Sequence, residues 1–99
     1  MFLAIGTYTT EWTKDDPLYA AHRDHMVTHV DSGALLCSGP RAGGGSVLIG
    51  NGTDRAAFQS ILDSDPFRTA GYVEFEVHEF TPGLVDERIG FDLVTGKSL

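Results

Sequence analysis

Two histidines on one predicted helix face are the clearest candidates for acid–base chemistry. His22 and His29 share that face with apolar residues such as Met26, at the spacing of a helix with 3.6 residues per turn. Imidazole is the side chain that most readily exchanges a proton near neutral pH. An inward-facing histidine is either a hydrogen-bonded core residue or a base in a pocket, and the helical pattern leaves both interpretations open.

A carboxylate at an unusual position is the second candidate. Asp65 directly precedes Pro66 and Phe67. Proline disfavours the α conformation for the residue before it, so Asp65 is expected at an extended corner and not inside a helix. A carboxylate fixed at such a corner can cap a helix or orient a base, and both roles fit the sequence.

Other kinds of site receive less support. His22, His25 and His29 share one side of the predicted helix, but residues seven apart lie about 10 Å apart along its axis, too far to bind one metal ion unaided. No His-Glu-x-x-His motif, nucleophile elbow or phosphate-binding loop is present. We therefore predict no metal and no cofactor.

A few residues could line a pocket near these groups. Ser38 precedes Gly39 and Pro40 at a predicted strand end, where a hydroxyl can point into a cleft, although a simple turn residue is the plainer interpretation. Trp12 is the one large apolar residue of the polar segment 9–16. It could line a pocket mouth, pack on the domain or lie at an interface.

The elements that would position these residues alternate between strand and helix patterns. A helix is expected to begin with Asp16 as N-cap and Pro17 at its first position, and to stop at Gly33. A second helix is expected to begin at Thr53 or Asp54 and to end before Asp65. Strands are predicted over residues 2–8, 34–38, 46–50 and 72–80, and the last of these alternates most strictly.

This order of elements, β-α-β-β-α-β, predicts an α+β fold of the ferredoxin-like kind with a four-stranded antiparallel sheet. Helices would cover only one face of that sheet. A second copy of the chain is the simplest cover for the other face, so we expect a homodimer. Residues 84–99 mix charged and isolated apolar residues, and fit either a short hairpin around Gly90 or an arm on the partner.

Composition restricts the partners. The 99 residues include 7 basic and 14 acidic side chains, a formal net charge of −7. That balance argues against nucleic-acid backbones and anionic membrane surfaces. No apolar run is long enough for a membrane span, and no signal peptide is evident, so we expect a cytoplasmic protein. The single cysteine, Cys37, is expected to be buried as a small apolar residue.

The order and spacing of several of these residues together resemble the YciI-like (YCII-related) family. The resemblance covers about residues 1–82 and leaves residues 83–99 as a C-terminal extension. It is carried by His22, Gly33, residues 35–40, the glycine-rich loop, Asp65-Pro66-Phe67, Ala70-Gly71 and a strand ending in Phe80-x-Pro82.

The resemblance implies a dimeric α+β barrel in which His22 and Asp65 face each other in a pocket. Ser38, Gly39, Pro40, Phe67 and Trp12 are then the candidates for binding a small-molecule substrate. Many relatives carry an arginine three residues before the histidine, whereas this chain has Tyr19 there. Arg23 is expected to point elsewhere.

Two functions follow as hypotheses. In the first, Asp65 holds one imidazole nitrogen of His22 and the other takes a proton from a small, partly aromatic substrate, as a cofactor-free lyase or isomerase. In the second, the chain is a non-catalytic dimeric module that binds a small ligand, or an accessory subunit, through the same cavity.

Overall fold

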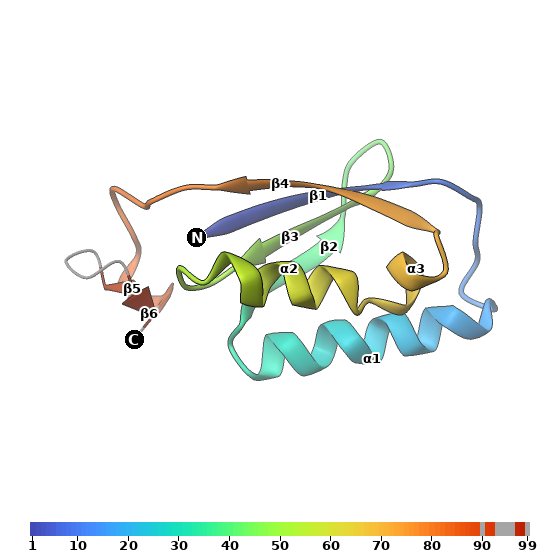
Figure 1. Ribbon diagram of the computed structural model, residues 1–99, viewed down its shortest axis with the longest axis horizontal. Coiled ribbons are helices and arrows are strands. Elements are labelled where there is room, and N and C mark those ends of the chain that lie inside the picture. Colours follow the sequence, from blue (N-terminus) through green and yellow to red (C-terminus); the bar gives the residue numbers. More distant parts are fainter. Residues whose placement is uncertain (90, 93–96, 99) are drawn as a thin grey trace.

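A single antiparallel sheet with helices on one face forms the body of the computed structural model, which describes residues 1–89, 91–92 and 97–98 (Figure 1). The strand order is β2-β3-β1-β4. The predicted ferredoxin-like β-α-β-β-α-β order is confirmed. The strands are β1 (Phe2–Tyr8), β2 (Leu35–Pro40), β3 (Ser46–Gly50) and β4 (Val73–Glu79), and the helices are α1 (Pro17–Asp31), α2 (Arg55–Asp63) and α3 (Pro66–Thr69).

Local signals start α1 and α2 where the sequence predicts, and a third, four-residue helix begins at Pro66. Asp16, Asp54 and Asp65 are the N-caps of α1, α2 and α3, and each side chain accepts a backbone N–H of the first turn. Pro17 and Pro66 occupy the first turns of α1 and α3, where a missing N–H costs nothing. After α1, Gly33 turns the chain with φ of +81°.

The core lies between the sheet and the helices. Phe2, Ala4 and Leu48 point from the sheet toward Phe58 and Leu62 of α2. The rings of Phe2 and Phe58 stack with centroids 5.0 Å apart. Gly50 allows this packing, because a Cβ there would lie 2.4 Å from the Phe58 ring.

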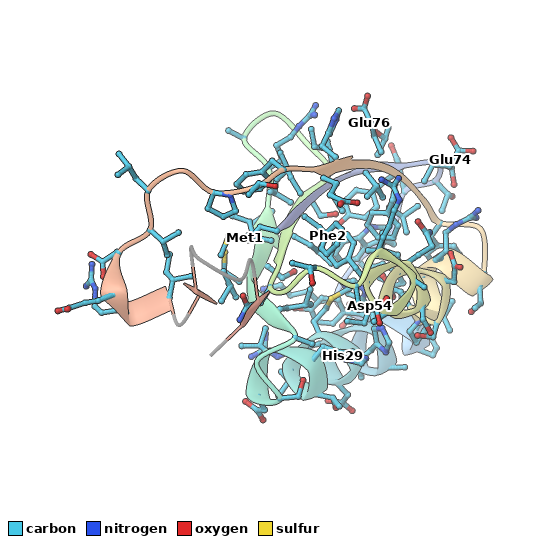
Figure 2. All side chains as sticks on the ribbon, turned by 60° about the vertical axis from the view of Figure 1, so that its left-hand side comes forward. Met1, Phe2, His29, Asp54, Glu74 and Glu76 are labelled. Atoms are coloured by element: carbon cyan, nitrogen blue, oxygen red, sulfur yellow. The ribbon has the colours of Figure 1, made fainter. Side chains whose placement is uncertain are left out.

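The opposite face of the sheet is not covered by any helix of the described chain. By the strand register, Leu3 and Ile5 of β1 share this face with Val47 and Ile49 of β3. All four are half-buried, not exposed. On β4 the same face carries charge, and Glu74 and Glu76 project away from the helices (Figure 2). This surface, which we call the open face, is therefore an apolar strip bordered by carboxylates.

Strand β2 departs from the sequence prediction in two ways. It continues through Gly39 to Pro40, and Cys37 is exposed, not buried. Because β2 is an edge strand, Pro40 need not donate to a further strand. A register shift between Leu35 and Cys37 turns Cys37 to the open face, opposite Ile49.

The contacts between the helices and the sheet decide which helix residues are buried. On α1, the expected inner-face residues His22, Met26 and His29 are buried or half-buried, and His25 is half-buried as well, against α2. On α2, Phe58, Ile61 and Leu62 are buried, whereas Ala56 and Ala57 are exposed. None of the helices over the described residues is long and apolar enough to cross a membrane.

The C-terminal segment forms small elements of its own. A 3-10 helix spans Glu87–Ile89, and β5 (Phe91–Asp92) pairs antiparallel with β6 (Lys97–Ser98). The predicted hairpin centre, Gly90, lies outside the described residues, and the paired strands follow it in sequence. Figure 1 shows this segment at the end of the molecule remote from α3.

Candidate active site

The two N-capping carboxylates at the start of α1 and α3 position the candidate site. Asp16 accepts the N–H of Leu18 at 2.9 Å through Oδ1 and the hydroxyl of Tyr72 at 3.0 Å through Oδ2. The start of α1 is thereby tied to the residue that precedes β4. That bond raises the pKa of the Tyr72 hydroxyl above its ordinary value. Further along α1, His22 contacts Asp65 and His25 contacts the Ile61 carbonyl of α2.

Asp65 combines the two roles that the sequence left open. Its backbone is extended, with φ −61° and ψ 124°, and its side chain is fully buried. Oδ1 accepts the N–H of Phe67 at 3.0 Å, which caps α3. The same oxygen lies 2.8 Å from Nδ1 of His22. One carboxylate oxygen has lone pairs for both bonds, so capping and orientation do not compete.

The second oxygen of Asp65 has a different environment. Oδ2 is buried and has no hydrogen-bond partner among residues 1–89. A buried polar atom without a partner lowers stability by about 1–3 kcal/mol. Most buried polar side-chain atoms in folded proteins have a hydrogen-bond partner, so this oxygen calls for an explanation other than helix capping. The fold therefore retains a carboxylate here that helix capping alone would not require.

His22 lies between Asp65 and a cavity. Its side chain is 18% exposed. Its ring stacks on Phe67 with centroids 4.2 Å apart and planes 4° apart, which fixes its orientation. An ionised carboxylate can only accept, so Nδ1 donates to Asp65 and the lone pair of Nε2 is left for a proton. His22 also lines the cavity wall.

The cavity lies between β1, the loop that follows it, α1 and the β2–β3 hairpin. Its volume is about 950 Å³, at the upper end of the range for small-molecule sites. Four of the predicted site residues besides His22 line it, namely Trp12, Ser38, Gly39 and Pro40. The further wall residues are Tyr8, Thr9, Thr10, Glu11, Lys14, Tyr19, Arg23, Arg41, Gly44, Gly45, Ser46 and Leu48.

Phe67 is the one predicted substrate-binding residue that the structure does not place on the cavity wall. It is fully buried and is not part of the cavity wall. It lies behind the wall, where its ring packs on Tyr8, Trp12 and Tyr72 at centroid distances of 6.4, 4.9 and 5.3 Å. Phe67 thus supports the side chains that face the cavity.

Several wall residues were missed by sequence reasoning. Tyr8 points to the helix side of the sheet, like Phe2 and Ala4. The alternation of side chains along β1 was the sequence signal that could have predicted this. Burial raises the pKa of Tyr8, the negative charge of Asp65 adds to that effect, and Ser46 opposes it. The phenol therefore stays neutral and able to donate a hydrogen bond. Arg23, expected to point elsewhere, also lines the cavity.

The other two histidines of α1 contact protein groups and do not line the cavity. His25 Nε2 lies 2.8 Å from the carbonyl oxygen of Ile61 and joins α1 to α2. The rings of His25 and His29 meet edge to face at 4.6 Å. Burial lowers the pKa of His29, and nearby His25 lowers it further. Among the described residues, no three His, Cys, Asp or Glu side chains form a metal-binding group.

Comparison with known families identifies the chain. The model of the YCII-related domain matches residues 1–81. The chain belongs to the YCII-related family. The expected resemblance is confirmed, and the family region contains His22, Asp65 and the whole cavity wall. No curated protein matches the chain.

A solved structure shares the fold of this YCII-related chain. It is the 5-chloro-2-hydroxyhydroquinone dehydrochlorinase of Burkholderia phenoliruptrix AC1100, in complex with 2,5-dihydroxybenzoquinone. The TM-score is 0.60 at 22% sequence identity, over 84% of this chain and 96% of the other. At this identity the likeness establishes the fold, and the chemistry has to be argued from the residues of the present chain.

Proposed function

We propose that this chain is a cofactor-free enzyme of the lyase or isomerase type in which His22 and Asp65 move a proton. The observation that carries the proposal is the 2.8 Å contact between His22 Nδ1 and buried Asp65, with His22 on the wall of the cavity. Asp65 holds the imidazole in one tautomer and orientation, and it stabilises the positive charge that the ring acquires. The opposite nitrogen, Nε2, is the proton acceptor.

The reaction needs no other group. Nε2 takes a proton from a C–H or O–H of the substrate, and the electron pair of that bond forms a new C=C or C=O bond. In an elimination, a leaving group departs with its own electron pair. In an isomerisation, the π electron pair of an adjacent C=O or C=C bond shifts to its far atom, and the His22 imidazolium returns the proton to an atom other than the one that lost it. Neutral Tyr8, on the same wall, can donate a hydrogen bond to a substrate oxygen on which negative charge develops.

The substrate is a small planar molecule with hydroxyl or carbonyl oxygens. Aromatic residues dominate one wall, and Trp12 stacks on Tyr19 with centroids 5.4 Å apart. The fold relative is named as a dehydrochlorinase of a chlorinated hydroxyhydroquinone, and that compound has this shape. This likeness guides the choice of the first compounds to test. For the present chain, we propose only the class of substrate, a small planar molecule with hydroxyl or carbonyl oxygens.

Two assays test the proposal. The purified protein is incubated with 5-chloro-2-hydroxyhydroquinone, and chloride release is measured. In parallel, exchange of the ring hydrogens of 2,5-dihydroxybenzoquinone with D₂O is followed by NMR. We expect rates above those without protein. A compound that binds near Trp12, quenches its fluorescence and is neither converted nor exchanged would favour the alternative, a non-catalytic ligand-binding module.

We also propose that the chain works as a homodimer through the open face. Leu3, Ile5, Val47 and Ile49 form an apolar strip on that face, and in a chain this short such a strip gains stability when a second copy buries it. The division into a domain of residues 1–82 and an extension of residues 83–99, which would lie as an arm on the partner, remains part of this proposal.

The dimer proposal predicts the effect of a charge on the open face. Light scattering at micromolar concentration should give about twice the mass of the 10.7 kDa chain. Ile5→Glu should weaken the dimer at least roughly 30-fold, because it buries a carboxylate opposite Glu76, as at an interface hot spot. Val27→Glu, on the exposed surface of α1, is the control and should stay dimeric. A monomeric parent protein would contradict the proposal.

A further inference from the structure

The charged residues of the chain are unevenly distributed around the cavity. Acidic side chains outnumber basic ones by 14 to 7 in the whole sequence. The cavity wall reverses this ratio, since it carries Lys14, Arg23 and Arg41 with Glu11 as the single carboxylate. The three cations come from separate elements: the loop before α1, α1 itself and the β2–β3 hairpin. The fold therefore brings basic residues together at one site of an acidic protein.

These cations have no carboxylate partners in the part of the chain that the structure describes. The arginine ion pairs found there are Arg55 with Glu79 and Arg88 with Asp86. Arg41 bonds instead to its own loop, with Nε 3.2 Å from the carbonyl oxygen of Gly44. That bond positions the guanidinium and leaves its two terminal nitrogens available. They form the fork that binds carboxylate or phosphate oxygens.

Three like charges around one cavity repel each other weakly through water, and an anion placed among them removes that repulsion. The adjacent wall is aromatic. Trp12 lies nearly parallel to Tyr19, with 20° between the planes, and meets Tyr8 edge to face at 5.3 Å. A planar ring can pack against this aromatic wall of the cavity while a charged substituent extends toward the cations. His22 shares this wall, so the ring would also lie within reach of the proposed base.

We propose that the cavity selects planar acids, namely an aromatic or conjugated ring that bears a carboxylate or phosphate group. Arg41 binds the anionic oxygens, assisted by Lys14 and Arg23, and the ring packs on Trp12 and Tyr19. This inference refines the substrate class of the proposed function and rests on it only in taking the same cavity as the ligand site. A neutral ring of the same shape would leave the cations unpaired and bind more weakly.

Trp12 provides the assay, because it is the only tryptophan of the sequence and lies on the cavity wall. Benzoate, its neutral isostere benzamide, and phenyl phosphate are titrated against the full chain, with calorimetry as a second readout. We expect one of the two anions to bind at least about tenfold more tightly than benzamide, the difference that one charge-assisted hydrogen bond provides. The stronger of benzoate and phenyl phosphate identifies the anionic group.

Two variants test whether Arg41 causes the preference for the anion over benzamide. Arg41→Gln should remove most of the preference for the anion, while Arg55→Gln, an arginine of α2 paired with Glu79, should keep it. Equal affinity for anion and amide, no saturable binding of either anion, or an unchanged preference in Arg41→Gln would overturn the proposal. The same titrations with His22→Asn separate this proposal from the proposed proton transfer. The variant should retain the preference for the anion even though it lacks the base, so one proposal can be wrong while the other holds.

Discussion

Replacement of His22 by asparagine is expected to lower kcat/KM for proton transfer by about 10²–10⁴-fold, with little loss of stability. The asparagine amide nitrogen can occupy the place of Nδ1 and donate to Asp65, so the buried carboxylate keeps its partner. The variant has no equivalent of Nε2, and therefore no base on the cavity wall. Chloride release and hydrogen exchange, the two assays given above, measure the loss.

His25→Gln is the matched control for this prediction. His25 lies one turn further along α1 and bonds to the Ile61 carbonyl through Nε2, an interaction that a glutamine amide can reproduce. Its activity should equal that of the parent protein. If His22→Asn retained activity within a few-fold of the parent, the imidazole would not be the base and the proposed mechanism would be wrong.

Asp65→Asn separates the negative charge of Asp65 from its capping role. The amide oxygen can take the place of Oδ1 and still accept the Phe67 N–H, so α3 should keep its cap. The same oxygen can accept from His22 Nδ1, but it has no negative charge to stabilise the imidazolium that forms when Nε2 takes a proton. We expect a lower kcat and an altered pH profile of kcat/KM. A purely structural Asp65 would change stability and leave the pH profile as it is.

Phe67→Ala is expected to lower the free energy of unfolding by about 3–5 kcal/mol. The ring is fully buried and contacts His22, Tyr8, Trp12 and Tyr72. Its removal leaves a void beneath the cavity wall and takes the stacked support from His22. Because small domains are stable by only about 5–15 kcal/mol, the variant should be close to unfolding. Urea denaturation followed by circular dichroism measures the change.

Two further substitutions serve as comparisons for the loss of stability expected in Phe67→Ala. Phe80→Ala removes the same ring from a position that is 47% exposed, and should cost less than about 1 kcal/mol. Phe67→Leu restores most of the buried volume but not the stacked contact with His22, so it should stay folded and lose activity. Similar losses of stability for Phe67→Ala and Phe80→Ala would show that Phe67 does not organise the site.

The sequence by itself determined the features that depend on neighbouring residues. Asp16-Pro17 predicts a cap and a first helical turn, and Pro66 predicts an extended Asp65, because proline restricts both itself and the residue before it. The apolar run at the N-terminus predicts β1 at its observed bounds. The order of these elements was then sufficient for the fold class, since few topologies accommodate β-α-β-β-α-β.

The tertiary structure decided which faces are buried and which residues meet. The apolar neighbours of Cys37 predict that it is buried. In the structure, however, β2 is an edge strand, and a register shift turns Cys37 outward. Lys14, Arg23 and Arg41 line one cavity only because a loop, a helix and a hairpin converge there. No periodicity within one element contains that information.

The contact between His22 and Asp65 was expected from the sequence, but not from any local pattern in it. The residues are 43 positions apart, so no local pattern joins them, and it was the resemblance to the YCII-related family that predicted the pair. For Asp65 the sequence offered capping or orientation as alternatives. The structure shows both, because one carboxylate oxygen accepts the Phe67 N–H and His22 Nδ1 together at a corner that Pro66 keeps extended.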